Sequence, residues 1–195
     1  MCSDRVSTGL GGGRRAAGIA LASLLLGACP RTEARGLDLD GNAVDPVTPG
    51  TVTALVFVGA KCPVSNRYAP EVRRIHGRFG PRGVAFELVY AGRTDTAPAV
   101  REHMASYGYT LRALRDPDHA LVRRAGATVT PEVAVFGRRR ELVYRGRIDD
   151  RQVDFGVARP EATRHDLEDA LEDALADRRG PARIVPAVGC SIGPP

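Results

Sequence analysis

The sequence predicts an α/β domain in which helices flank a central mixed β-sheet. Residues 53–59 form a continuous apolar run, which is typical of a strand buried on both faces. An amphipathic helix and a second strand follow this run, the order of a parallel β-α-β unit, and a hairpin and a closing helix come later. The length of 195 residues and the hydrophobic fraction of 43% suit one domain with tails. The charged fraction of 26% excludes a generally disordered chain.

The N-terminus has the pattern of a targeting segment. Arg14 and Arg15 precede an apolar run over residues 16–28, which is too short to cross a bilayer but has the size of a signal-peptide core. The run ends in Leu-Gly-Ala-Cys at residues 26–29, which resembles the lipobox of bacterial lipoproteins. That resemblance implies a signal peptide over residues 1–28, a lipid on Cys29 and a tether over residues 29–36. Secretion with a cut near Ala28 is the alternative.

The charge of the chain carries little functional information. The formal net charge is +5, and it falls to +3 without residues 1–28. Lys61 is the sole lysine beside many arginines, and no basic stripe is interleaved with aromatic residues. Nucleic acid is therefore not an expected partner.

The first half of the domain contains four expected elements. Residues 37–44 alternate around Asp40-Gly41, which predicts a short hairpin. The buried strand over residues 53–59 follows it. From Val64 to Phe79 apolar residues recur every three or four positions, which predicts a helix with Pro63 in its first turn. Residues 84–90 predict the next strand.

The second half alternates shorter helices and strands. Residues 97–107 predict a helix ended by Gly108, and residues 116–118 offer caps for another helix that stops at Gly126. The last helix is expected from about Pro160 to Gly180-Pro181, with Leu167 and Leu171 on its buried face. Short strands are expected at residues 111–114, 133–136 and 142–144, with a turn at 138–140.

The chain has four cysteines, at positions 2, 29, 62 and 190. No two of them are close in sequence, so zinc-ribbon spacing, a Cys-x-x-Cys pair and a haem-attachment motif are all excluded. Cys2 and Cys29 belong to the targeting segment, which leaves Cys62 and Cys190 as the thiols of the mature domain.

Cys62 lies between the buried strand and the start of the helix at Pro63. The unpaired N–H groups and the positive end of the helix dipole stabilise a thiolate there, as does the neighbouring Lys61. A thiolate is the nucleophile of disulfide exchange, so Cys62 is a candidate catalytic residue. The alternative is an inert small residue in a turn.

Several ordered motifs resemble the redoxin branch of the thioredoxin-like superfamily. The resemblance implies a thioredoxin-like fold over residues 37–180 with an N-terminal β-hairpin, Cys62 as the redox-active cysteine, and Pro131 as a cis-proline facing it. The motifs lie at residues 61–71, 116–122, 130–132, 144–150 and 187–190.

The chain departs from the best-known members of that superfamily at single positions. Ser65 stands where a thioredoxin has its second cysteine, although its hydroxyl can hydrogen-bond a thiolate. Gly59 and Leu55 stand where a peroxiredoxin has threonine and proline, and Asn66 stands where a copper-delivery protein of the Sco type has a cysteine. Each of those activities therefore lacks one part.

Cys190 is the candidate to supply the missing thiol. It lies on a Gly- and Pro-rich tail, residues 181–195, which is expected to be flexible enough to bring it near Cys62. We expect a Cys62–Cys190 disulfide, either catalytic or structural, because these are the free thiols left in an oxidising compartment. The alternative is a Cys190 that pairs with nothing.

Three further residues are weaker candidates. His119 can act as a base or a ligand, but a histidine at the start of a helix more often caps the helix. His103 beside Met104 indicates a copper site only weakly, because a metal site needs more ligands. Glu87 lies in an otherwise apolar strand, where two interpretations are open. It is either a buried carboxylate that relays protons or an exposed residue at the edge of the sheet.

The sequence thus predicts an envelope thiol–disulfide oxidoreductase that uses Cys62, with Cys190 as its resolving cysteine. A peroxidase acting through a Cys62 sulfenate, and a non-enzymatic docking module with a structural disulfide, are the alternatives. Thiol or disulfide proteins are the expected partners, together with a membrane reached through the lipid anchor. No cofactor and no metal are expected.

Overall fold

The computed structural model describes residues 34–195. The expected signal peptide with Cys2, the lipidation site Cys29 and most of the tether lie outside the described residues. Within residues 34–195, no helix has the length and apolar character needed to cross a membrane.

The centre of the fold is a mixed β-sheet, as the sequence predicts. Three strands, β3 (Val52–Val58), β4 (Val84–Tyr90) and β5 (Arg112–Arg115), run parallel. β7 (Glu132–Phe136) pairs antiparallel with the other edge of β3, and β8 (Leu142–Gly146) pairs antiparallel with β7. Every residue of β3 is buried, which explains its uninterrupted apolar sequence.

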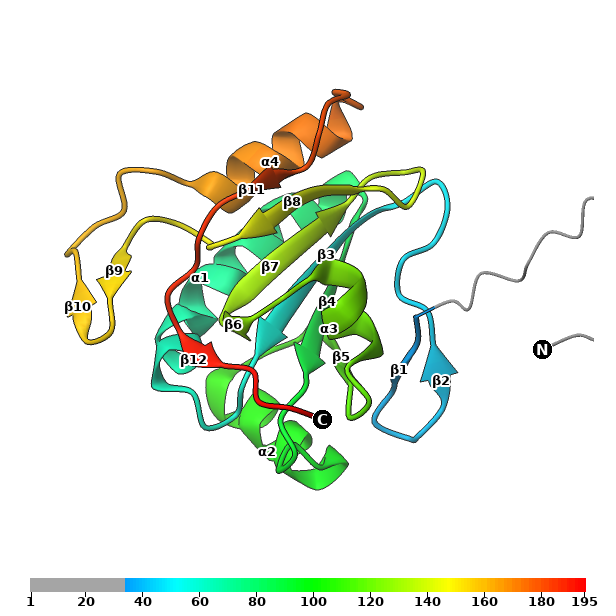
Figure 1. The fold of residues 1–195 in the computed structure, drawn as a ribbon, viewed down its shortest axis with the longest axis vertical. Helices are drawn as coiled ribbons and strands as arrows, with labels where there is room; N and C mark the ends of the chain where they lie inside the picture. The colour runs from blue at the N-terminus through cyan, green and yellow to red at the C-terminus, as the bar shows by residue number, and fades with distance from the viewer. Residues whose placement is uncertain (1–33) are drawn as a thin grey trace, which may run out of the picture. The chain divides into compact units, whose positions relative to one another are not determined.

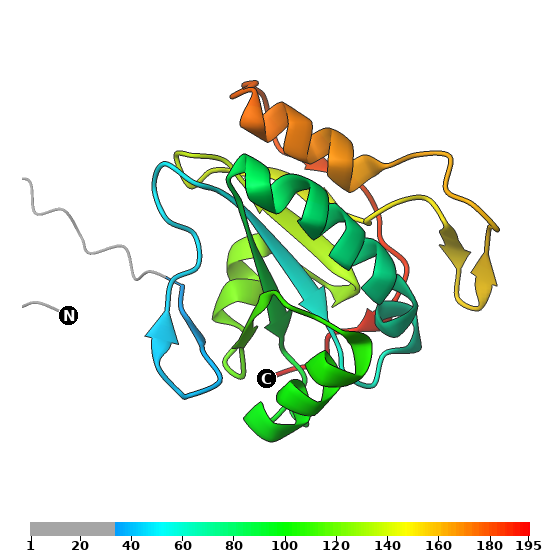
Figure 2. The ribbon, with the colours of Figure 1, turned by 180° about the vertical axis from the view of Figure 1, so that it is seen from behind.

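Helices cover both faces of this sheet (Figures 1 and 2). Helices α1 (Pro63–Phe79) and α4 (Asp166–Leu175) pack on one face, against side chains such as Ala54 and Val56 of β3. Helix α3 (Ala120–Ala125) packs on the opposite face, against Leu55 and Phe57. Successive β3 side chains therefore enter two separate cores, as the pleat requires. Helix α2 (Ala97–Tyr107) contacts α1.

The N-terminal hairpin is confirmed. Strand β1 (Gly36–Leu37) pairs with β2 (Ala43–Val44) and also joins β5, which extends the main sheet. The carboxylate of Asp38 accepts the backbone N–H groups of Asp40 and Asn42, at 2.9 and 2.8 Å, and so closes the turn.

The last helix begins later than the sequence predicts. It starts at Asp166, not near Pro160, because Asp150 holds the preceding segment in a non-helical form. The Asp150 carboxylate accepts the N–H groups of Thr163 and Arg164, at 2.7 and 2.9 Å. The hairpin of β9 (Gln152–Asp154) and β10 (Val157–Ala158) was also not predicted; most of its residues are exposed, so it lacks the apolar alternation of a half-buried strand.

The C-terminal segment is paired with the rest of the domain, whereas the sequence predicts a flexible tail. Strand β11 (Arg183–Ile184) joins β8 in parallel at the edge of the main sheet. Strand β12 (Cys190–Ser191) then pairs antiparallel with the short strand β6 (Val129–Thr130), and the two lie side by side in Figure 1. The pairing of β11 and β12 with the domain, and not flexibility of the tail, therefore determines the position of Cys190.

Candidate active site

Cys62 is the N-cap residue of α1, at the end of the loop that follows β3. Its side chain is almost fully buried, with 4% exposed. The backbone N–H of Ser65 donates to the Cys62 sulfur at 3.4 Å, and the thiol donates to the carbonyl oxygen of Thr130 at 3.0 Å. The sulfur therefore lies between the start of a helix and the segment before Pro131, where a helix dipole favours its charged form.

The structure brings Cys190 and Pro131 to the same place. The Thr130–Pro131 peptide bond is cis, as the resemblance implies. In the β6–β12 pair, Cys190 lies opposite Thr130, and the Thr130 hydroxyl donates to the carbonyl oxygen of Cys190 at 3.4 Å. Cys62 and Cys190 line the same cavity, each affects the acidity of the other, and both are free thiols.

The two thiols differ strongly in acidity. Burial acts to raise the pKa of Cys62, but hydrogen bonds from Cys190, Ser65 and Thr130 outweigh it and lower this pKa from 9.0 to about 7. Burial, followed by the hydrogen bond to Cys62 and the charge of Cys62, raises the pKa of Cys190 from 9.0 to about 11. Cys62 therefore ionises first, and Cys190 keeps its proton as a donor to the thiolate.

Ser65 and Lys61 occupy different positions relative to the sulfur. Ser65 is buried, and its hydroxyl accepts the backbone N–H of Gly59 at 3.4 Å, so it also fixes the loop before Cys62. Lys61 is exposed on the rim of a cavity of about 210 Å³ that opens beside both cysteines. Thr130, Asp95 and Ile192 contribute further to the lining of this cavity.

Asp95 is a residue of this cavity that the sequence did not single out. It is buried, and burial raises the pKa of its carboxyl group, against hydrogen bonds from the backbones of Gly92 and Ala60 and the charge of Lys61. The Gly92 N–H lies 3.0 Å from the carboxylate. Asp95 therefore joins the loop after β4 to the loop that carries Cys62. Its sequence context, a polar stretch before a helix, resembles an ordinary loop.

A hydrogen-bond chain also supports the Cys62 loop. The hydroxyl of Tyr90 lies 2.9 Å from Nδ1 of His103, and Nε2 of His103 lies 2.8 Å from the side-chain oxygen of Asn66. The amide nitrogen of Asn66 then donates to the carbonyl oxygen of Ala60 at 3.3 Å. Both ring nitrogens of His103 are engaged, so it is not available to copper and its role is structural.

The other weak candidates also have structural partners. Nε2 of His119 lies 2.9 Å from the carbonyl oxygen of Ala91, in a buried position. Glu87 is buried and forms an ion pair with Arg112, its direct cross-strand partner on β5. The exposed-edge interpretation of Glu87 is therefore wrong.

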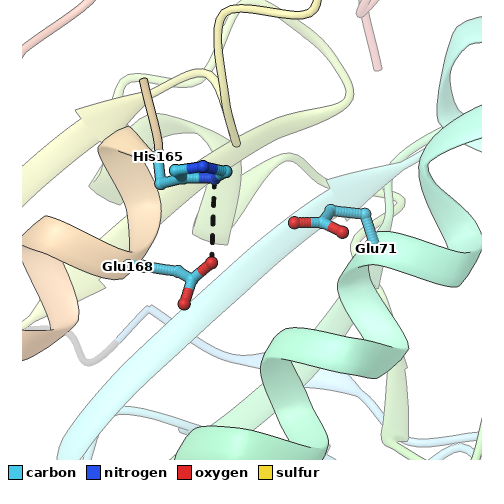
Figure 3. A group of neighbouring side chains, drawn as sticks. All are labelled: Glu71, His165 and Glu168. Carbon is cyan, nitrogen blue, oxygen red and sulfur yellow. Dashed lines mark ion pairs between the residues drawn. The ribbon is translucent and has the colours of Figure 1, made fainter. Parts of the chain in front are cut away.

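A second group of side chains has metal-like spacing, as Figure 3 shows. Ligand atoms of Glu71, His165 and Glu168 lie within 4.8 Å of one another, beside an open depression of about 690 Å³. Arg74 forms ion pairs with both glutamates, and Arg78 also pairs with Glu168. These guanidinium groups already neutralise the carboxylates and would repel a cation, so the group is an ion-pair network between α1 and α4.

Comparison with known proteins identifies the family of the chain and structures of similar fold. The Redoxin family model matches residues 28–163. An uncharacterized conserved protein from Geobacillus kaustophilus is 26% identical, with a TM-score of 0.67 over 81% of this chain and 86% of that one. A hypothetical protein from Sinorhizobium meliloti is 24% identical, with a TM-score of 0.68 over 83% and 90%. No curated protein matches the chain.

The fold is also that of known disulfide oxidoreductases. A secreted Mycobacterium tuberculosis disulfide oxidoreductase, homologous to DsbE of E. coli, is 18% identical, with a TM-score of 0.52 over 71% of this chain and 93% of that one. At this identity the likeness concerns the fold, and it confirms the expected thioredoxin-like architecture.

Proposed function

The chain belongs to the Redoxin family and is a redox enzyme, and we propose that it catalyses thiol–disulfide exchange with Cys62 and Cys190 as its reactive pair. The observation that carries this proposal is that both thiols line one cavity beside Pro131, where Cys190 lies opposite Thr130 and the Cys62 thiol donates to the carbonyl oxygen of Thr130. A thiol whose pKa lies near the ambient pH is the most effective attacking group in such exchange, and Cys62 meets this condition.

The proposed reaction has two displacement steps. The Cys62 thiolate attacks one sulfur of a substrate disulfide, the substrate S–S bond breaks, and the departing thiolate takes up a proton. Cys190 then loses its proton and attacks the Cys62 sulfur of the mixed disulfide, which releases the second substrate thiol. Two electrons pass from the cysteine pair to the substrate, and the enzyme ends with a Cys62–Cys190 disulfide. A dithiol reductant returns it to the starting state, and the same steps in reverse oxidise a dithiol substrate.

The acidity of the two thiols suits this order. While Cys62 is a thiolate, its charge and hydrogen bond help to keep Cys190 protonated. Formation of the mixed disulfide removes that charge, so the pKa of Cys190 falls at the stage when Cys190 must attack. Ser65 and Thr130 act by hydrogen bonding to the Cys62 sulfur, and Lys61 adds a positive charge at the mouth of the cavity.

The proposed setting is the cell envelope. The motif at residues 26–29 supports removal of a signal peptide over residues 1–28 and lipid attachment at Cys29. The redoxin domain would then follow a tether over residues 29–36, and thiol or disulfide proteins of an oxidising compartment would be its partners.

Peroxide reduction is less well supported by the site. Gly59 holds the position of the peroxiredoxin threonine, and a Cβ atom added there would lie 3.2 Å from the Cβ of Cys62 and 3.3 Å from the hydroxyl of Thr130. A threonine fits only if these neighbours move. Stopped-flow measurement of hydrogen peroxide consumption checks this point, and we expect slow reaction.

A single-turnover experiment tests the proposal. The reduced protein, with Cys2 and Cys29 replaced by serine so that Cys62 and Cys190 are its two thiols, is mixed with a peptide disulfide, quenched with acid and examined by intact mass. We expect the unaltered protein to lose two hydrogens, C190S to accumulate a mixed disulfide with the peptide, and C62A to do neither. S106A, a change at an exposed serine of α2, serves as the control. An unaltered protein that retains both thiols, or a C62A variant that reacts like it, would overturn the proposal.

The reduction potential separates a catalytic pair from a structural disulfide. A value below about −300 mV is typical of a structural disulfide, whereas a higher value is typical of a catalytic one. We expect the higher value.

A further inference from the structure

Strand β12 occupies an edge that otherwise has no strand partner. Among residues 34–195, β6 pairs with β12 alone. Cys190 lies opposite Thr130 and Ser191 opposite Val129, and the N–H of Ile192 extends the pairing by donating to the carbonyl oxygen of Thr128 at 2.9 Å. An edge of this kind is a template on which any extended segment can add as a strand.

The contact between this edge and the C-terminal segment requires a glycine. A Cβ atom added to Gly189 would lie 2.1 Å from the carbonyl oxygen of Thr130 and 3.1 Å from the nitrogen of Pro131. Both are backbone atoms, so neither can turn aside as a flexible side chain can. The residue before the cysteine must therefore lack a side chain if the strand is to lie in this position.

The C-terminal segment has separate contacts with the domain before and after Cys190. Upstream, Arg183 donates to the side chain and carbonyl oxygen of Asp166, at 3.1 and 2.8 Å, and β11 pairs with β8. Downstream, β12 has two residues, Ile192 packs against the core beneath α3, and Arg93 donates to the carbonyl oxygen of Pro195 at 3.5 Å, although residues 193–195 are exposed. Because β11 and β12 pair with different strands, displacement of β12 from β6 would leave the β11 anchor in place.

We propose that β12 is a built-in occupant of the β6 edge, which a substrate polypeptide displaces when it pairs there. The substrate class is an extended segment in which glycine precedes the disulfide-bonded cysteine, because the resident Gly189-Cys190 shows what the edge accepts. This inference rests on the proposed function and adds a preference for the residue that precedes the substrate cysteine.

The exchange of strands follows the chemistry. The substrate segment replaces β12, and its cystine sulfur is attacked by the Cys62 thiolate; the partner sulfur leaves as a thiol after protonation. As β12 returns to β6, Cys190 attacks the Cys62 sulfur and the segment leaves as a cysteine thiol. The cysteine pair supplies both electrons.

Peptide disulfides of matched sequence test the specificity. The probes are Ala-Val-Gly-Cys-Ser-Ile, a copy of residues 187–192, and Ala-Val-Val-Cys-Ser-Ile, each joined through its cysteine to 5-thio-2-nitrobenzoate. The symmetric aromatic disulfide of the same chromophore is the small-molecule probe. The protein is the full chain with C2S, C29S and C190S, which retains the segment and has Cys62 as its single thiol, so it cannot close an internal disulfide. We expect the glycine peptide to release chromophore about tenfold faster than the valine peptide.

A variant of the occupant tests the displacement. Adding Gly189→Val to C190S should push the segment off β6 and raise the rate with the glycine peptide severalfold, with a smaller change for the small disulfide. The control is Gly180→Val in the same background, since no atom lies within 4 Å of a Cβ added at Gly180. Circular dichroism establishes that each variant is folded.

The outcomes separate this inference from the proposed function. Equal rates for the two peptides, or a Gly189→Val variant that matches the Gly180→Val control, overturn strand exchange even if the small disulfide reacts normally. If the C190S protein fails to react with the small disulfide as well, the proposed function itself is wrong.

Discussion

The Cys62 sulfur lies 3.0 Å from the carbonyl oxygen of Thr130, a residue 68 positions away in the sequence. As a thiol, Cys62 donates its proton to this oxygen; as a thiolate it has no proton to give, and the same contact becomes repulsive. The donors that remain, which are Ser65, Cys190 and the side chain of Thr130, must therefore stabilise the charged form. The acidity of Cys62 is a balance between these opposing contacts.

The first prediction concerns the pH dependence of Cys62. Its rate of alkylation by iodoacetamide should rise with a midpoint at about pH 7, which follows from its pKa. C190A should shift the midpoint upward because it removes a donor to the thiolate, whereas C190S should shift it less because a hydroxyl still donates. A midpoint unchanged in C190A would show that the two side chains do not interact.

The second prediction concerns the effect of the Cys62 pKa on the pH dependence of folding stability. The pKa of Cys62 is lower in the folded protein than the ordinary value of 9.0, so ionisation favours the folded state. This contribution is present above pH 9 and is lost as the pH falls through about 7. Urea unfolding of the reduced protein should show a midpoint that rises between these values more than that of C62A does. Parallel curves for the two proteins would contradict the prediction.

The third prediction concerns Ser65. Ser65→Ala removes a hydrogen bond that lowers the pKa of Cys62 and the acceptor for the Gly59 N–H. We expect severalfold slower alkylation at pH 7 but an ordinary rate at pH 10, where the thiol is ionised in both proteins. Ser106→Ala is the matched control on an exposed surface. A rate reduced equally at both pH values would point to a change of access instead of acidity.

The fourth prediction concerns the hydrogen-bond chain behind the Cys62 loop. Asn66→Ala leaves Nε2 of the buried His103 without its partner and frees the carbonyl oxygen of Ala60. Loss of such buried hydrogen bonds costs about 1–3 kcal/mol in the free energy of unfolding. Urea unfolding measures this cost, and amide hydrogen exchange should become faster in residues 59–62. Exchange that stays unchanged in this loop would exclude a supporting role for the chain.

The fifth prediction concerns the network between α1 and α4. Glu168 is buried and is held by Arg74 and Arg78, so Glu168→Gln should lower the free energy of unfolding by about 1–3 kcal/mol. Asp169→Asn, at an exposed neighbour, is the control and should have little effect. Added Zn²⁺ should not raise the Tm of the unaltered protein; a rise that Glu168→Gln abolishes would restore the metal interpretation.

The sequence predicts the central elements well because their patterns arise locally. The strand at residues 84–90 and the helix at 97–107 have the predicted bounds, since apolar spacing and the Gly108 stop determine them within a few residues. The N-cap position of Cys62 follows from its neighbour Pro63 in the same way.

Features that depend on distant contacts were missed. The late start of α4 depends on Asp150, more than ten positions upstream, and the position of Cys190 depends on pairing with β6. Asp95 and the partners of His103 likewise acquire their meaning from loops that meet only in the folded chain. No local pattern of residue types records such contacts.

Because Cys62 and Cys190 are far apart in sequence, the redox state of this pair affects the stability of the whole domain against unfolding. In a Cys-x-x-Cys motif the disulfide closes one helical turn, but here it would close a loop of about 130 residues that contains the elements from α1 to β11. The chain-entropy relation gives a cross-link of this length about 5 kcal/mol of stabilisation against unfolding. Each catalytic cycle would then alternate between a cross-linked domain and a linear one, so a reductant would act on the lifetime of the protein as well as on its active site.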